Sequence, residues 1–156
     1  MIALQDEYNL NITLLLFVAW VNRDGNAVTR ADIDELWCGL MAWDSDVIKP
    51  LRAVRRRMKS RPDLAFGPTS DALRGRVKAC EIDGELIMLD ELDRAHGRRA
   101  RSEGDAGCGA GLSLRGAIRQ VFVTTTGRTP VPQDAERVLD HFASVVEAVA
   151  ASASDS

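Results

Sequence analysis

The feature that most constrains the fold is a nearly uninterrupted apolar run over residues 12–21, in which only Thr13 is polar. A helix that is apolar on every side has no face suited to water, so it belongs at the centre of a core. The run is about half the ~20 residues that a membrane-spanning helix needs. The acids Asp6 and Glu7 precede it, where a signal peptide carries Lys or Arg. We therefore expect a buried central helix and no membrane association.

Capping residues divide the first part of the chain into helices. Residues 2–8 are typical of a short helix, and Asn9 or Asn11 can begin the apolar helix by accepting hydrogen bonds from its first amides. Gly25 follows that helix and can adopt the left-handed conformation of a C-terminal cap. Thr29 can begin the next helix in the same way as the asparagines.

An apolar stripe at helical spacing follows Thr29. Its members recur in steps of three and four residues: Leu36, Leu40, Trp43, Val47, Leu51, Val54 and Met58. Residues 44–46 interrupt the stripe with capping side chains, and Pro50 cannot donate a backbone hydrogen bond. We therefore predict two helices that meet near residues 44–46. The side chains expected to share one core are Leu15, Leu16, Trp20, Trp43, Leu51 and Val54.

The second half of the chain contains further helical signals around a glycine-rich stretch. A helix is predicted from Thr69 or Ser70 to about Ala95, with Gly97 ending it. Residues 120–126 have strand character, but no second strand exists to pair with them, so we favour helix. A last helix is expected over 132–150.

These segments together predict an all-α protein, a single-domain bundle of about five to seven helices with an apolar central helix. Its expected parts are a helical core (1–97), a glycine-rich flexible loop (98–112), C-terminal helices that pack on the core (113–150) and a disordered tail (151–156).

Composition excludes several classes of protein. The formal charge is -3, which implies no polyanionic partner for the chain as a whole. Cys38, Cys80 and Cys108 form no CxxC pair, so neither a disulfide framework nor a four-thiolate zinc site is indicated. Free thiols are typical of a reducing compartment, and we expect a cytoplasmic protein.

Three stretches resemble a known family: Leu4-Gln5-Asp6, residues 11–20, and Ile48 to Arg52 with Arg55 and Arg56. Together they are similar to short bacterial helical proteins grouped as domain of unknown function 2390. The resemblance covers roughly residues 3–95, and Glu81 and Glu85 match acidic positions of its long helix. It implies a helical fold, and it assigns no activity and no catalytic residue.

Candidates for catalysis are few, and we expect no catalytic residue, metal or cofactor. Asp90, Asp93 and His96 lie on one helix, and Asp93 with His96 mimics the carboxylate–histidine spacing of a bundle metal site. The second such pair and the further carboxylates are missing, and a solvated acidic helix end explains these residues. The glycines between 104 and 111 lack the strand and the GK[ST] ending of a phosphate-binding loop. Cys108 has no neighbouring His in sequence to lower its pKa.

Residues 49–61 hold seven basic side chains and no acid, so the rest of the chain carries a charge of -10. At about 100° per residue, Lys49, Arg52, Arg56 and Lys59 lie nearly opposite the apolar stripe, and we expect them to face outward. The alternative is that this basic face pairs with acids of the later helix. That acidic run is Glu81, Asp83, Glu85, Asp90, Glu91 and Asp93.

Three functions remain open at this point. The favoured one is a non-catalytic interaction or regulatory module that docks an acidic protein, or another anionic macromolecule, on Lys49, Arg52, Arg56 and Lys59. The second is a nucleic-acid-binding accessory protein, which only eight aromatic residues make less favourable. The third is a small helical metalloenzyme built on Asp90, Asp93 and His96. The sequence leaves a small-molecule ligand unknown.

Overall fold

The computed structural model describes residues 2–23, 25–26, 28–102 and 110–154, and within these residues the chain is helical and contains no strand. This confirms the all-α prediction. The elements in chain order are α1 (Ile2–Tyr8), α2 (Ile12–Arg23), α3 (Arg30–Trp43), the π-helical segment η1 (Asp44–Ile48), α4 (Lys49–Ser60), the 3-10 turn η2 (Pro62–Leu64), α5 (Pro68–Ser102), α6 (Leu114–Thr126) and α7 (Gln133–Ser154). No helix in this part of the chain is long and apolar enough to cross a membrane.

Helix α2 lies in the middle of the body, packed against α5, α6 and α7. It provides the core with six buried side chains, listed in chain order as Leu14, Leu15, Phe17, Val18, Ala19 and Val21. The predicted apolar central helix is therefore confirmed.

One side of α2 is nevertheless open. Leu15 is fully buried, whereas Leu16 is 49% exposed and Trp20 is 47% exposed. These two residues are one helical turn apart and share a side that the other described elements leave half exposed. Val54 is 45% exposed, so the predicted core is wrong at three positions. Trp43 and Leu51 are partly buried.

The predicted caps are in place. The Oδ1 atom of Asn11 accepts a hydrogen bond from the Leu14 amide at 2.8 Å, which begins α2. Thr29 accepts from the amide of Asp32, and the Asp32 carboxylate accepts from the Thr29 amide, so α3 begins with a complete capping box. Gly25 has a φ of +84°, in the left-handed region that favours glycine.

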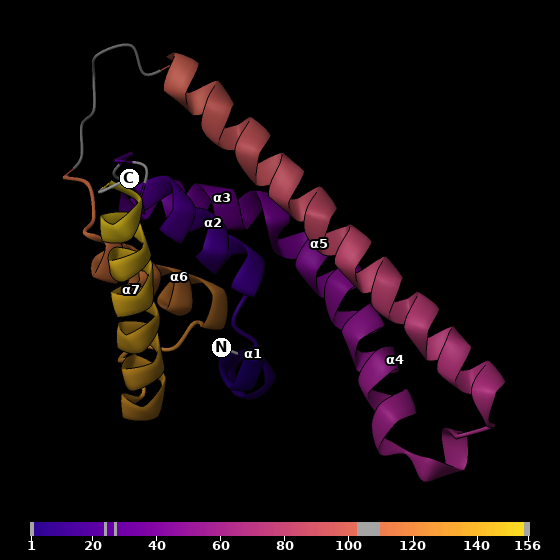
Figure 1. Ribbon diagram of the computed structural model, residues 1–156. Helices are drawn as coiled ribbons and strands as arrows, with labels where there is room; N and C mark the ends of the chain where they lie inside the picture. The colour runs from indigo at the N-terminus through magenta and orange to yellow at the C-terminus, as the bar shows by residue number, and fades with distance from the viewer. Residues whose placement is uncertain (1, 24, 27, 103–109, 155–156) are drawn as a thin grey trace.

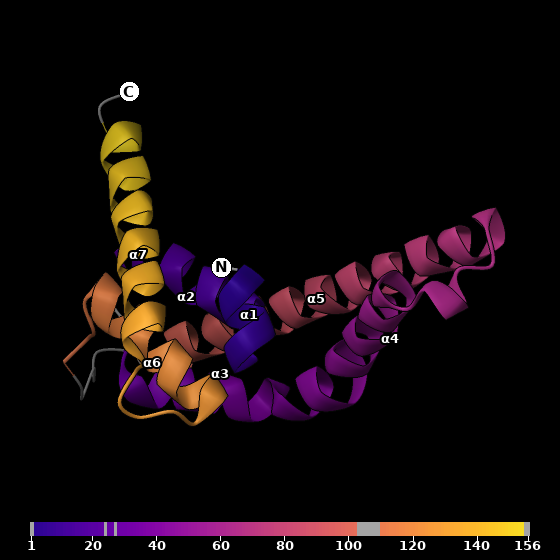
Figure 2. The same ribbon diagram turned by 90° about the horizontal axis from the view of Figure 1, so that it is seen from below.

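Helices α3 and α4 follow each other through η1 without a break in helical backbone, so the interruption predicted near residues 44–46 is a π-helical segment. Helices α4 and α5 then form an antiparallel hairpin joined by η2, and this hairpin projects from the body (Figures 1 and 2). We call residues 49–80 the basic arm.

Two boundaries differ from the prediction. Helix α5 passes Gly97 and continues to Ser102, so the expected loop does not include residues 98–102. Residues 103–109 lie outside the described residues. Residues 120–126 are helical, as favoured, and lie in α6. Helix α7 continues to Ser154, so the expected tail is wrong for residues 151–154. Small helix-compatible residues, mostly alanine, carry the helix through 148–154.

Candidate functional site

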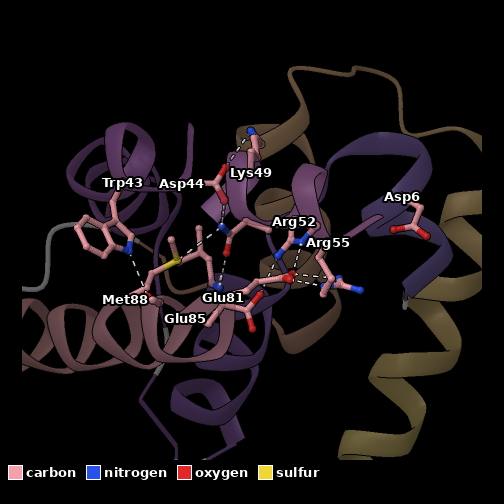
Figure 3. A network of polar contacts seen from close by, with 12 residues as sticks. Asp6, Trp43, Asp44, Lys49, Arg52, Arg55, Glu81, Glu85 and Met88 are labelled. Carbon is pink, nitrogen blue, oxygen red and sulfur yellow. Dashed lines mark hydrogen bonds and ion pairs between the residues drawn. The ribbon is translucent and has the colours of Figure 1, made fainter. Parts of the chain in front are cut away.

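The side of α4 that faces α5 is its basic side. Arg52 is only 8% exposed. Its Nε atom donates to Glu81 at 2.9 Å, and its Nη2 atom donates to Glu85 at 2.7 Å (Figure 3). Arg55 donates twice to the same Glu81 carboxylate, at 2.5 and 3.2 Å. Arg52, Arg55, Glu81 and Glu85 form what we call the α4–α5 ion-pair network.

The outward orientation predicted for Arg52 is therefore wrong. The alternative, in which the basic face pairs with the acidic run of the later helix, is confirmed for Arg52 and Arg55. The sequence period identifies two opposite faces of α4, but it does not say which face is buried. The carboxylate of Glu81 accepts hydrogen bonds from both guanidinium groups, and such charge-assisted bonds allow arginines to be buried between helices.

The other predicted site residues occupy different environments. The Nζ atom of Lys49 lies 2.8 Å from Oδ2 of the buried Asp44. Arg56 is partly exposed and forms an ion pair with Asp6. Lys59 is exposed and makes no ion pair with any other described residue. The structure therefore does not bring the four residues together as one solvent-facing stripe.

The ion-pair network sets the charge state of its members. Burial alone would raise the pKa of Glu81, but the hydrogen bonds from Arg55 and Arg52 outweigh burial and hold that pKa below its usual range. The hydrogen bond to Glu81 likewise raises the pKa of Arg55. Glu81 and Arg55 therefore both remain charged at neutral pH.

A second set of contacts fixes the base of the arm. Asp44, in η1, accepts a hydrogen bond from Nδ2 of Asn11 at 2.9 Å, which ties η1 to the start of α2 (Figure 3). The indole Nε1 of Trp43 donates to the carbonyl oxygen of Gly84 at 3.1 Å. A Cβ at Gly84 would lie 2.6 Å from Cδ1 of Ile48, so a larger residue at this position would force the end of the Ile48 side chain to shift.

Four exposed cations of the basic arm make no ion pair with another described residue. They are Arg57 and Lys59 on α4 and Arg76 and Lys78 on α5. The two residues on α5 were not predicted as binding residues from the sequence. The hairpin returns them beside α4, and the signal that indicates them is the low number of acids throughout residues 49–80.

The arm as a whole carries an unusual charge. Residues 49–80 contain ten basic and two acidic side chains, a formal charge of +8, so the remainder of the chain carries -11. Acids outside the arm partly neutralise this charge, because Asp6, Asp44, Glu81 and Glu85 pair with arm residues. The charge that remains is concentrated on an element that projects from the body.

The candidate metal residues do not converge. Asp90 pairs loosely with Arg94 at 3.9 Å, Asp93 is exposed, and the ring of His96 lies edge-on to Phe17 at 6.0 Å between centroids. In the described ranges, no three His, Cys, Asp or Glu side chains are placed to hold a metal ion. Cys108 and most of the glycine-rich stretch lie outside the described residues.

A cavity of about 930 Å³ lies between α3 and α5. Its lining includes apolar side chains such as Leu36, Trp43 and Ile87, and the carboxylates of Glu35 and Glu91. These residues offer apolar contact and negative charge. Among the described residues that line the cavity there is no cysteine or serine.

The family described as protein of unknown function (DUF2390) matches residues 1–92, more than half of the chain. The chain belongs to this family. No curated protein and no solved structure matches it.

The DUF2390 match covers α1 to α4 and most of α5. It therefore includes both sides of the ion-pair network and the whole basic arm. Helices α6 and α7 lie beyond the matched residues. The DUF2390 region carries the arm, and α6 and α7 cover the body from which the arm projects.

Proposed function

We propose that this protein is a non-catalytic interaction module that docks an acidic protein on its basic arm. The observation that carries the proposal is the charge of +8 on a projecting hairpin in a chain whose remainder carries -11. A charge separated in this way steers an anionic partner toward one end of the molecule and repels it from the rest.

The structure gives the four binding residues proposed from the sequence different environments, so we propose different roles for them. Lys59 stays as a direct contact, and the exposed Arg57, Arg76 and Lys78 join it. Lys49 and Arg56 contribute positive charge while paired with Asp44 and Asp6. Arg52 contributes by holding α4 on α5.

An acidic protein fits the arm better than a nucleic acid does. Phe66 is the only aromatic residue in the arm, so bases would find little to stack on. The arm also exposes Val54, Phe66 and Leu73 among its cations, which favours a partner that has both carboxylates and apolar side chains. The proposal places the protein in the cytoplasm, consistent with the exposed free thiols of Cys38 and Cys80.

The test compares two variants with the same change in net charge. The arm variant joins Arg57→Glu with Lys59→Glu, and the control joins Arg30→Glu with Arg137→Glu, two exposed positions in α3 and α7. The probes are a fluorescent glutamate- and leucine-containing peptide and a DNA duplex, followed by fluorescence anisotropy at several salt concentrations.

We expect the wild type and the control to bind the peptide with an affinity that falls as salt rises, and the arm variant to lose at least about tenfold in affinity. An equal loss of peptide affinity in the arm variant and the control would show that binding depends on net charge and not on the arm. Binding to the duplex without binding to the peptide would replace the proposal with nucleic-acid binding.

A further inference from the structure

A groove of about 400 Å³ runs between α2 and α5, on the open side of α2. Ile12, Thr13 and Leu16 line it from α2, and the residues that line it from α5 include three exposed apolar side chains, Ile82, Leu86 and Leu89. We call this the α2–α5 groove. Exposed apolar side chains gathered along a groove are typical of a surface that another protein covers.

The exposed face of α5 along this groove has opposite charges at its two ends. Lys78 precedes the apolar side chains, and Asp93 follows them. At about 100° per residue, Lys78, Ile82, Leu86, Leu89 and Asp93 fall within about 80° of one another around the helix axis. Lys78 and Asp93 are exposed, and neither makes an ion pair with another described residue.

The spacing of these residues is complementary to itself. When two copies of α5 lie antiparallel, with a two-fold axis between positions 85 and 86, Lys78 of each copy lies opposite Asp93 of the other. The same axis places Ile82 opposite Leu89 and the two Leu86 side chains next to each other. A two-fold axis requires one surface to match itself, and this face of α5 meets that requirement in both charge and apolar character.

We propose that the α2–α5 groove is the interface of a homodimer, in which α5 of one copy packs antiparallel against α5 of the other. Leu16 and, one turn later, Trp20 of α2 flank the paired helices, and burial in the dimer explains why two large apolar side chains of the central helix are exposed in a single chain. The basic arm of each copy points away from the axis in opposite directions. Lys78 belongs to both surfaces, but Arg57, Lys59 and Arg76 are not part of the groove, so the variant Arg57→Glu with Lys59→Glu tests docking without changing the dimer interface.

Analytical ultracentrifugation of the full chain tests the proposal. We expect the wild type to sediment as a dimer at about 100 µM, a concentration at which a dissociation constant of about 10 µM gives mostly dimer. Leu86→Asp should sediment as a monomer. The matched control is Leu73→Asp, because Leu73 is also exposed but lies about 180° around α5 from Ile82, and it should remain a dimer.

A charge exchange tests the antiparallel arrangement without changing an apolar residue. Lys78→Glu and Asp93→Lys should each raise the dissociation constant by about tenfold or more, because each places like charges opposite one another. An equal mixture of the two variant chains should recover the wild-type constant, because each copy then meets an opposite charge. Circular dichroism checks that each variant is folded.

Three results would overturn the proposal. They are a monomeric wild type, equal dissociation of Leu73→Asp and Leu86→Asp, and a mixture of the two charge variants that does not recover the dimer. None of these results bears on peptide binding by the arm, so failure of the dimer and failure of the proposed function are distinguishable.

Discussion

Replacement of Arg52 by Ala is the perturbation that most directly tests how the arm is held. Arg52 makes one hydrogen bond to the buried Glu81 and one to Glu85, whose side chain is 33% exposed. Removing one partner of a buried ion pair costs about 3–5 kcal/mol, because the other charge stays buried. Here Arg55 still donates to Glu81, and solvent screens Glu85. We therefore expect a loss of about 2–3 kcal/mol in the free energy of unfolding, at the low end of that range or below it.

The assay is urea denaturation followed by far-ultraviolet circular dichroism, at a protein concentration low enough to exclude association. The matched control is Lys59→Ala, a truncation of an exposed basic residue of the same helix, which should change the free energy of unfolding by less than about 0.5 kcal/mol. Arg52→Lys should fall between the two, because lysine keeps the charge but cannot donate to two carboxylates in the planar arginine geometry.

The difference in the free energy of unfolding between the wild type and Arg52→Ala should also depend on pH. The pKa of Glu81 in the folded protein lies below its ordinary value of 4.5, so this group stabilises the fold above that value and stops doing so as the pH falls through the folded pKa. The difference between wild type and Arg52→Ala should therefore be full at neutral pH and narrow below about pH 4.5. Equal urea midpoints for Arg52→Ala and Lys59→Ala at neutral pH would refute the reasoning.

Two further predictions concern the body. Leu15→Ala should lower the free energy of unfolding by about 2–5 kcal/mol and Leu16→Ala by less than about 1 kcal/mol, because Leu15 is fully buried and Leu16 is half exposed. Urea denaturation of dilute protein measures both losses, and equal losses would contradict the burial pattern. The hydrogen bond from Tyr8 to Asp134 raises the pKa of Tyr8, the only tyrosine, to about 12, so its phenolate absorbance should appear well above pH 10, and Asp134→Asn should lower the midpoint.

The elements that could be predicted from the sequence are those decided by local chemistry. The helix caps are of this kind. Asn11 and Thr29 accept hydrogen bonds from amides three residues later, and Gly25 adopts a left-handed backbone angle. The helical state of residues 120–126 was favoured because a strand needs a partner strand. Thr125 and Thr126 satisfy their hydroxyls by donating to carbonyl oxygens one turn earlier in α6.

The burial of α4 could not be predicted in this way, because it depends on residues about 30 positions distant. Periodicity assigned Val54 to the core and Arg52 to the surface, and both assignments are reversed. The deciding partner is Glu81, whose carboxylate accepts hydrogen bonds from two arginines of α4. An acidic run and a basic run of matching length are a signal for such pairing, but only the hairpin geometry shows which residues meet.

The ion-pair network lies where the arm and the α2–α5 groove meet. Arg55, Lys78, Glu81 and Glu85 all line one end of the groove, while Arg52 and Arg55 hold α4 against α5. A change at Glu81 would therefore disturb the arm and the groove together. Changes at Arg57 and Lys59 affect the arm alone, and a change at Leu86 affects the groove alone. If docking and dimerisation are both real, the surface variants will separate them, and a variant of Glu81 will impair both through the position of α4 on α5.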